Sequence, residues 1–187
     1  MRNVNWDDVT TSNIGDTGGF SRLEPGGYVA KIVSAADHED KSYFELVFDI
    51  AEGPNTGHYS DAWGVEHPNA HRIVMSYKPT AVNMLAGRLN AIDASNPGFD
   101  SRAACKANRF DFFVGRLVGV VMREEEYRRR DGSVGVRVSL DQVVTVQAVR
   151  DGLVKPRAIK RLADGGSSGG GEPFNPVIAA SIDVPFA

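Results

Sequence analysis

The sequence has little that could hold a fold together covalently or anchor it in a membrane. Cys105 is the only cysteine among 187 residues, which excludes an internal disulfide framework and a zinc site built from several thiolates. No apolar run approaches the roughly 20 residues that a membrane-spanning helix needs. The opening stretch Met1–Asp8 does not have the pattern of a signal peptide. We therefore expect a cytoplasmic protein that makes no membrane contact and relies on its own core.

An excess of positive charge is also missing. The formal net charge is −3, and residues 165–187 contain no Lys or Arg. The preceding 164 residues carry 21 basic and 22 acidic side chains, a net charge of −1. These 164 residues are therefore not basic overall, but basic side chains could still gather on one face of the folded domain. Length and composition suit one globular domain with tails. We expect an arm over 1–24, a domain over 25–164 and a Gly-rich linker with a tail over 165–187.

Catalytic motifs are absent as well. The chain has no Gly-rich phosphate loop followed by Lys, no Gly-x-Ser-x-Gly elbow and no paired Cys and His set. His58, His67 and His71 suggest a metal site. However, Pro68 and Asn69 argue against a helix there, and no cysteine completes a ligand set. We expect a protein that is not an enzyme and that holds no metal and no cofactor.

Two alternating stretches dominate what is present. In the first, Tyr28, Ala30 and Ile32 share one face. The second stretch, Tyr43–Ile50, places its apolar Phe, Leu and Ile residues on one face and mostly polar residues on the other. Period-two alternation indicates half-buried strands. Because the linker His38–Asp40 is short and polar, we expect an antiparallel hairpin that begins a small β-barrel.

The next segments predict an edge strand and a helix. Thr56–Trp63 combines aromatic residues with polar flanks, which favours a third strand, and Asn69–Tyr77 favours a further extended piece. Pro79 suits the first turn of a helix. Apolar residues then recur at spacings of three, four and three, which predicts an amphipathic helix of about four turns. These residues are Val82, Leu85, Leu89 and Ile92.

The second half of the domain predicts a short helix and a second hairpin. Asn96–Gly98 should end the first helix, and Asp100 should cap a short second one. Phe110–Met122 indicates a buried strand, with Gly115 and Gly119 at a bulge or bend. The pair Asp131–Gly132 is a strong hairpin-turn signal, and alternating Val and Leu residues follow it.

The predicted fold is mainly β: a five-stranded barrel with one or two interposed helices and a flexible C-terminal tail. This is the architecture of the oligonucleotide-binding fold. Such proteins hold single strands by stacking bases on aromatic rings and tracking the backbone with a basic groove. The aromatic and basic side chains that we expect outside the core form the candidate DNA-binding site. They are Tyr43, Tyr59, Trp63, Arg72, Lys78, Tyr127, Arg128, Arg129 and Arg130.

Three segments also resemble a family of phage and prophage proteins that are encoded near recombination and replication functions. The similar runs are Gly26–Val33, Phe44–Pro54 and Phe113–Val121, the last followed by Glu124–Tyr127. Members of this family are regarded as single-stranded-DNA-binding proteins. The resemblance covers roughly residues 24–150 and implies a phage-encoded protein that coats single-stranded DNA during replication or recombination in a bacterial host cell.

The C-terminal tail resembles the tip of bacterial single-stranded-DNA-binding proteins, where an acidic stretch ending in Ile-Pro-Phe docks onto replication and repair partners. The matching residues here are Asp183, Val184, Pro185 and Phe186. The tail departs from that pattern because the tip has one acidic residue, Asp183, before the Pro-Phe pair, and because Ala187 follows the phenylalanine. The resemblance implies that the tail recruits replication or recombination proteins, with Phe186 as the anchor.

Two other functions remain open on the sequence. A barrel of this kind could be a protein-interaction module, which predicts no affinity for single strands even at low salt. The carboxylates of Glu124–Glu126 could instead hold a divalent ion in a nuclease, which predicts strand degradation that depends on magnesium or manganese. The sequence leaves open the oligomeric state, including a homo-oligomer, the binding-site size, the choice between DNA and RNA, and the identity of the tail's partner.

Overall fold

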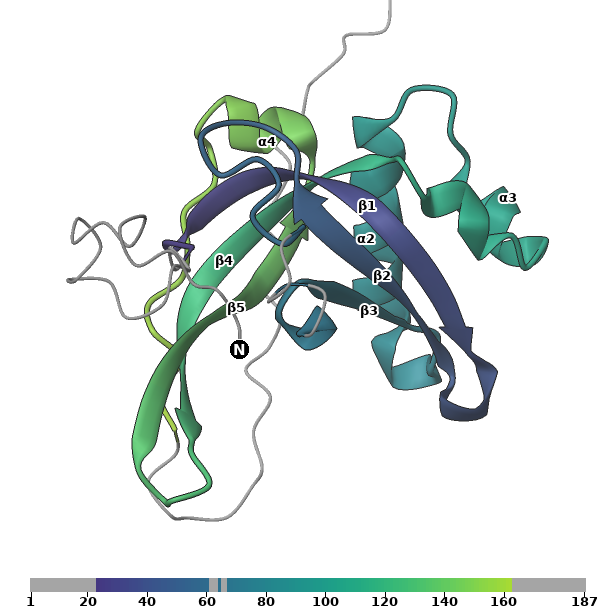
Figure 1. Cartoon of the computed structure of the whole chain (residues 1–187). Helices are drawn as coiled ribbons and strands as arrows, with labels where there is room; N and C mark the ends of the chain where they lie inside the picture. The colour runs from purple at the N-terminus through teal and green to yellow at the C-terminus, as the bar shows by residue number, and fades with distance from the viewer. Residues whose placement is uncertain (1–22, 61–63, 65–66, 163–187) are drawn as a thin grey trace, which may run out of the picture.

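The centre of the molecule is one five-stranded antiparallel sheet with the strand order β3-β2-β1-β4-β5 (Figure 1). The computed structural model describes residues 23–60, Gly64 and 67–162. The strands are β1 (Gly26–His38), β2 (Tyr43–Ile50), β3 (Arg72–Ser76), β4 (Leu117–Arg128) and β5 (Val134–Val144). The prediction of a mainly β fold with five strands is confirmed.

The first hairpin forms as its alternation predicts. β1 pairs antiparallel with β2, from Ala30 opposite Ile50 to His38 opposite Tyr43. Every second residue of β2 is buried, with Phe44, Leu46, Phe48 and Ile50 no more than 2% exposed. The turn is a short 3-10 segment, η3 (Glu39–Lys41). A register shift between Ile32 and Ser34 places a bulge in β1, and bulges of this kind increase the local twist of a strand.

The predicted strand over Thr56–Trp63 is wrong for the described part of that segment. Residues 53–60 form successive turns, in which the Thr56 amide donates to the Gly53 carbonyl at 3.2 Å and the Ser60 amide donates to the Gly57 carbonyl at 3.0 Å. Gly53 and Gly57 adopt φ values of 85° and 76°, a left-handed backbone that a strand does not contain. The third strand is β3, within the predicted stretch Asn69–Tyr77.

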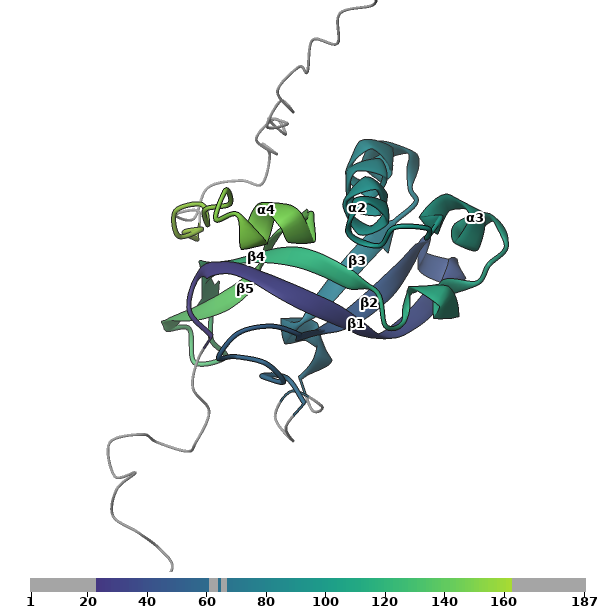
Figure 2. The ribbon, with the colours of Figure 1, turned by 90° about the horizontal axis from the view of Figure 1, so that it is seen from above.

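The helices lie on one side of the sheet, and residues 51–60 lie on the other (Figure 2). They are α2 (Val82–Ser95), α3 (Ser101–Lys106) and α4 (Val146–Arg150). Three further 3-10 segments lie in the connections: η4 (Pro68–Ala70), η5 (Pro79–Ala81) and η6 (Phe110–Phe113). Leu89 and Ile92 of α2 enter the core, whereas Val82 is 50% exposed. The predicted apolar stripe therefore packs against the core from Leu85 onward.

The ends of the helices follow the predicted local chemistry. α2 ends at Ser95, directly before Asn96–Gly98. The carboxylate of Asp100 accepts a hydrogen bond of 2.8 Å from the Ala103 amide and so caps α3. Pro79 opens η5 and not α2 itself. The cap and the stop are confirmed, and the helix begins three residues later than the proline suggests.

The two glycines predicted to mark a bend serve different purposes. Gly115 has a φ of 85° and lies just before β4, so it turns the chain into that strand. Gly119 lies inside β4, where an added Cβ would be 2.6 Å from the Thr145 carbonyl oxygen. Gly119 therefore permits the close approach of the segment that leads into α4. The register shift between β4 and β5, where a bulge would lie, occurs instead between Val121 and Met122.

The sheet is open, so the predicted closure into a barrel is not observed. Its edge strands are β3 and β5, and no ladder joins them in the described part of the chain. A cavity of about 270 Å³ lies between them. Arg72 and Val74 of β3 and Ser139 of β5 line this cavity. The guanidinium of Arg88 on α2 donates to the Val74 carbonyl, so side chains occupy the seam between the two edges.

The last described segment returns to β4 and pairs with its free edge. The Glu126 amide donates to the Lys160 carbonyl at 2.8 Å, and the Lys160 amide donates to the Glu124 carbonyl at 3.0 Å. These bonds lie beyond Met122, where the pairing of β1 with β4 ends. The basic segment 150–162 is therefore attached to the second hairpin. Within the described residues, no helix combines the length and the apolar character needed to cross a membrane.

Candidate nucleic-acid interface

The second hairpin presents a tyrosine ring between two guanidinium groups. Tyr127 on β4 lies opposite Gly135 on β5. A Cβ added at Gly135 would be 2.9 Å from the Tyr127 ring and 2.8 Å from Nε of Arg129, so both side chains extend over this glycine. The guanidinium carbon of Arg137 is 5.4 Å from the ring centroid, within the range of a cation–π contact. This arrangement places a half-buried aromatic ring and two cations together on one face of the sheet.

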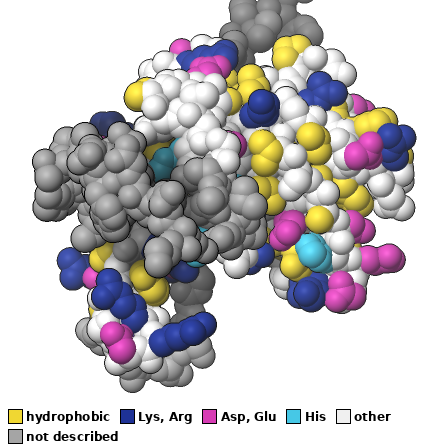
Figure 3. All heavy atoms as spheres, viewed as in Figure 1, with side chains coloured by type: hydrophobic (Ala, Val, Ile, Leu, Met, Phe, Trp, Pro, Cys, Tyr) yellow, Lys and Arg dark blue, Asp and Glu magenta, His cyan; other side chains and the backbone are white. Residues whose placement is uncertain are grey.

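Three consecutive arginines continue from this ring into the turn. Arg128, Arg129 and Arg130 are exposed, and Lys and Arg side chains gather over this hairpin (Figure 3). Arg128 donates to the Gly132 carbonyl at 3.3 Å. Within the described residues, the guanidiniums of Arg129 and Arg130 have no ion-pair partner. Unpaired guanidiniums are available to bind phosphate oxygens.

The predicted residues Tyr43 and Arg72 lie on the face of β2 and β3 that the alternation places opposite the core. Tyr43 is half-buried, and its ring centroid is 4.7 Å from that of His38. Arg72 pairs with Glu45 at 3.3 Å, and Glu45 also lies 3.5 Å from Nε2 of His38. This face therefore carries one aromatic platform, and its predicted phosphate contact is already occupied by a carboxylate.

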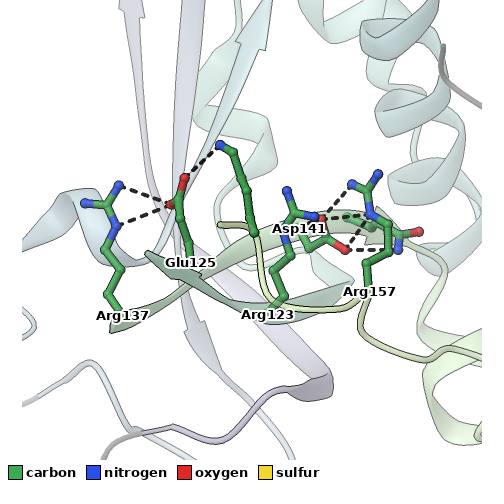
Figure 4. Close-up of polar contacts among 7 residues, drawn as sticks. Arg123, Glu125, Arg137, Asp141 and Arg157 are labelled. Atoms are coloured by element: carbon green, nitrogen blue, oxygen red, sulfur yellow. Dashed lines mark hydrogen bonds and ion pairs between the residues drawn. The ribbon is translucent and has the colours of Figure 1, made fainter. Parts of the chain in front are cut away.

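An ion-pair network supports the base of the second hairpin (Figure 4). The side chain of Asp141 has no exposed area and pairs with Nε of Arg123 at 3.0 Å and with Arg157 at 2.6 Å. Burial alone would raise the pKa of Asp141, but hydrogen bonds from Arg157 and Gln142, with the nearby arginine charges, hold that pKa below its usual range. Asp141 is therefore ionised at neutral pH and holds segment 150–162 against the sheet.

Glu125 forms the second centre of the network. It pairs with Arg137 at 3.2 Å and with Lys160 at 2.7 Å. Burial would raise its pKa, but the hydrogen bond and charge of Lys160, with further hydrogen bonds from Arg137 and Ser139, lower it overall. Since Arg137 also approaches the Tyr127 ring, Glu125 sets the position of one of the two cations beside that ring.

Tyr59 is not part of an exposed surface, so its predicted outward orientation is wrong. It is 5% exposed and stacks on His71 with ring centroids 4.4 Å apart. Phe48 meets it edge to face at 6.0 Å. Burial, with smaller effects of Tyr28 and Asp49, raises the pKa of its hydroxyl. The turns over 53–60 fold this ring onto the core, where it cannot stack on a base.

Some predicted residues lie elsewhere. Lys78 is exposed and immediately precedes η5. Trp63 and the tail residues Asp183, Val184, Pro185 and Phe186 lie outside the described residues, as do the greater part of the predicted arm and the Gly-rich linker. Their roles remain predictions.

The acidic run does not converge on one point. Glu124, Glu125 and Glu126 are successive residues of β4, so their side chains alternate between the two faces of the sheet. Glu125 is held by two cations, and Glu126 accepts a hydrogen bond of 3.0 Å from the Leu162 amide. Among the described residues, no group of three or more His, Cys, Asp or Glu side chains is placed to hold a metal ion.

Sequence reasoning missed several residues at this surface. The position of Arg137 could have been predicted. The turn at Asp131–Gly132 sets the register of the hairpin, and this register places Arg137 opposite Glu125 and close to Tyr127. Arg88, Arg123 and Lys160 had no such signal. Their proximity depends on how α2 and the last segment cross the two edges of the sheet. Scans with protein-family models and among curated proteins found no match to this chain.

Proposed function

We propose that the protein binds single-stranded DNA without sequence preference and does so without catalysis. The strand order, with α2 between β3 and β4, supports an oligonucleotide-binding fold, although no ladder joins β3 to β5 among the described residues. Proteins of that fold bind strands with the face of their second and third strands and with the loops between strands 1 and 2 and strands 4 and 5. Here those positions hold Tyr43, Arg72 and the second hairpin.

The observation that carries the proposal is the position of Tyr127 between Arg129 and Arg137, beside the exposed Arg128 and Arg130. A base stacked on the ring would have cations on both sides for its neighbouring phosphates. Every base has a π-face, so such a platform tolerates any sequence. Because the chain is near neutral overall, this local concentration of guanidiniums provides the attraction for the strand.

The path of the strand follows from the two hairpins. The turn between β1 and β2 and the turn between β4 and β5 lie at opposite sides of β3 (Figure 1). A strand that stacks on Tyr43 at one end and Tyr127 at the other would cross the cavity between β3 and β5. Such a path needs an extended single strand, because paired bases would not expose their faces to either ring.

The biological setting remains part of the proposal. The sequence resemblance supports a role for a phage-encoded protein in coating single strands during replication or recombination. In that role the tail over Asp183–Phe186 would recruit a partner protein, while Trp63 would add a further stacking platform.

Fluorescence anisotropy tests the proposal. The full chain is titrated into labelled oligo-dT, with a matched duplex, at a series of salt concentrations. We expect single-strand binding that weakens steadily with salt, by about 0.7 in the log–log slope per phosphate contact, and much weaker duplex binding. An absence of single-strand binding at low salt would reject the proposal. Loss of oligonucleotide length with added magnesium or manganese would favour the nuclease alternative.

A further inference from the structure

The cavity between β3 and β5 has a cationic wall. Four of its lining side chains are Arg72, Arg88, Arg123 and Lys160, and Glu125 is the one carboxylate among the described residues that line it. Three of the cations are paired with carboxylates, although Asp141 and Glu125 each hold two cations. Arg72 pairs with Glu45, Arg123 with Asp141 and Lys160 with Glu125. The fourth, Arg88, is different.

Within the described residues, Arg88 has no carboxylate partner. Its guanidinium donates to the carbonyl of Val74 on β3. Burial lowers the pKa of this group, with no offsetting negative charge. A guanidinium carries five N–H donors, and a partly desolvated cation without an anion is unfavourable. Arg88 therefore points to a site for an anion.

The position of the cavity suggests which anion it takes. Arg72, on the proposed path of the strand, lines one side, and Glu125, which holds Arg137 beside Tyr127, lines the other. The cavity thus lies between the two proposed stacking platforms, where the backbone of a strand would pass. Its volume of about 270 Å³ is large enough for a phosphate group with ordered water, given that one water occupies about 30 Å³ in the liquid.

We propose that this cavity is a phosphate-binding site in which Arg88 holds one backbone phosphate of the bound single strand. This inference rests on the proposed function for the source of the phosphate. Arg72, Arg123 and Lys160 add a positive field around the site, while their own carboxylates keep them in place. A bidentate contact from Arg88 would fix the register of the strand between the two rings.

The test uses the full chain and two cavity variants. Arg88→Gln removes the cation, and Asn69→Asp places a carboxylate at the cavity wall with almost no change of shape while Arg88 stays. Arg109→Gln is the control, since it makes the same chemical change at an exposed arginine paired with Asp111. Circular dichroism and melting temperature confirm that each variant is folded.

One arm measures anisotropy with labelled oligo-dT over a salt series, and the other measures binding of inorganic phosphate by phosphorus NMR. We expect each cavity variant to weaken oligo-dT binding about tenfold and to lower the salt slope by about 0.7, with no change for the control. If both cavity variants bind oligo-dT like the wild type, the inference is overturned, although the proposed function stands.

The phosphate arm separates the source of the anion from the site itself. Phosphate binding that is lost in both cavity variants, with unchanged oligo-dT binding, would show an anion site for free phosphate and would overturn its use by the strand. Absence of oligo-dT binding by the wild type would instead reject the proposed function, and the strand as the source of the phosphate with it.

Discussion

Tyr127 lies directly opposite Gly135 in the ladder between β4 and β5, and its ring occupies space that a side chain at position 135 would need. Glycine is normally unfavourable within a strand because it has no side chain to pack and loses more chain entropy on ordering. Because Gly135 has no Cβ, the Tyr127 ring and the Arg129 side chain can lie directly against β5. The pair therefore links a local cost in strand stability to the shape of the candidate interface.

The first prediction concerns this ring. Tyr127→Ala should weaken oligo-dT binding about tenfold, because one stacked base contributes about 1–3 kcal/mol. Gly135→Val should have a similar effect, since its Cβ would displace the ring while valine favours the strand. Anisotropy titrations measure both effects. Val134→Thr, at an exposed position of the same strand, is the control, and equal affinities for all four proteins would remove Tyr127 from the interface.

The second prediction concerns the turn arginines. Arg129→Ala combined with Arg130→Ala should lower the log–log salt slope of oligo-dT binding by about 1.4, because each lost phosphate contact removes about 0.7. Lys106→Ala combined with Lys155→Ala removes the same charge from exposed positions elsewhere. The control pair should leave the slope nearly unchanged. Equal reductions in both double variants would indicate a general effect of net charge and not a contact at the turn.

The third prediction concerns the network at Asp141. Asp141→Asn should reduce the free energy of unfolding by about 3 kcal/mol, because it leaves Arg123 without its charge partner in a setting with little solvent. Urea unfolding at pH 7 measures this loss. Asp111→Asn breaks an Asp–Arg pair at the exposed surface and should cause no measurable change. A wild-type urea midpoint for Asp141→Asn would show that the network contributes nothing to stability.

The fourth prediction is the pH dependence of the same contribution. The pKa of Asp141 is lower in the folded protein than its usual value, so its contribution is fully present above the unfolded pKa of about 3.9. It is lost as the pH falls through the folded pKa. The stability difference between wild type and Asp141→Asn should therefore be constant from pH 7 to about pH 5 and shrink toward pH 3. A difference that stays constant down to pH 3 would contradict the lowered pKa.

The fifth prediction separates Tyr59 from the interface. Tyr59→Ala should reduce the free energy of unfolding by about 3 kcal/mol or more, because it removes a buried ring from contact with Phe48 and His71. Tyr59→Phe keeps the ring and should leave oligo-dT affinity unchanged. Chemical unfolding and anisotropy test the two statements. A loss of oligo-dT affinity in the folded Tyr59→Phe protein would return this residue to the candidate site.

The parts of the fold that local chemistry decides could be predicted from the sequence. The alternation in Tyr43–Ile50 determines which face of β2 is buried, and the carboxylate of Asp100 caps α3 through a contact three residues away. Asn96–Gly98 ends α2 for a similarly local reason. These features depend on neighbours in the chain, so sequence patterns describe them well.

The segment around Tyr59 could not be predicted in this way. Aromatic residues between polar flanks suggest a strand, but Gly53 and Gly57 turn the chain, and the ring then stacks on His71 from another part of the sequence. The gap between the edge strands β3 and β5 could not be predicted for the same reason. Arg88 of α2 binds the edge of β3, a contact that depends on tertiary packing and has no trace in residue spacing.

The candidate site likewise has a part that the sequence predicts and a part that depends on tertiary packing. Tyr127 and the arginines of the turn belong to one hairpin, so the sequence brings them together directly. The ion pairs that join Asp141 to Arg157 and Glu125 to Lys160 connect residues far apart in the chain. Segment 150–162 is basic in sequence, but much of its charge serves to attach it to the second hairpin.

Ultraviolet cross-linking of oligo-dT to the full chain, followed by mass spectrometry of the peptides, tests most directly whether a single strand lies across the surface between the two hairpins. We predict adducts at Tyr127 or within residues 128–137, with weaker adducts near Tyr43, and their suppression by unlabelled oligo-dT but not by duplex. Adducts confined to α3 and η6, or no specific adduct at all, would contradict this account.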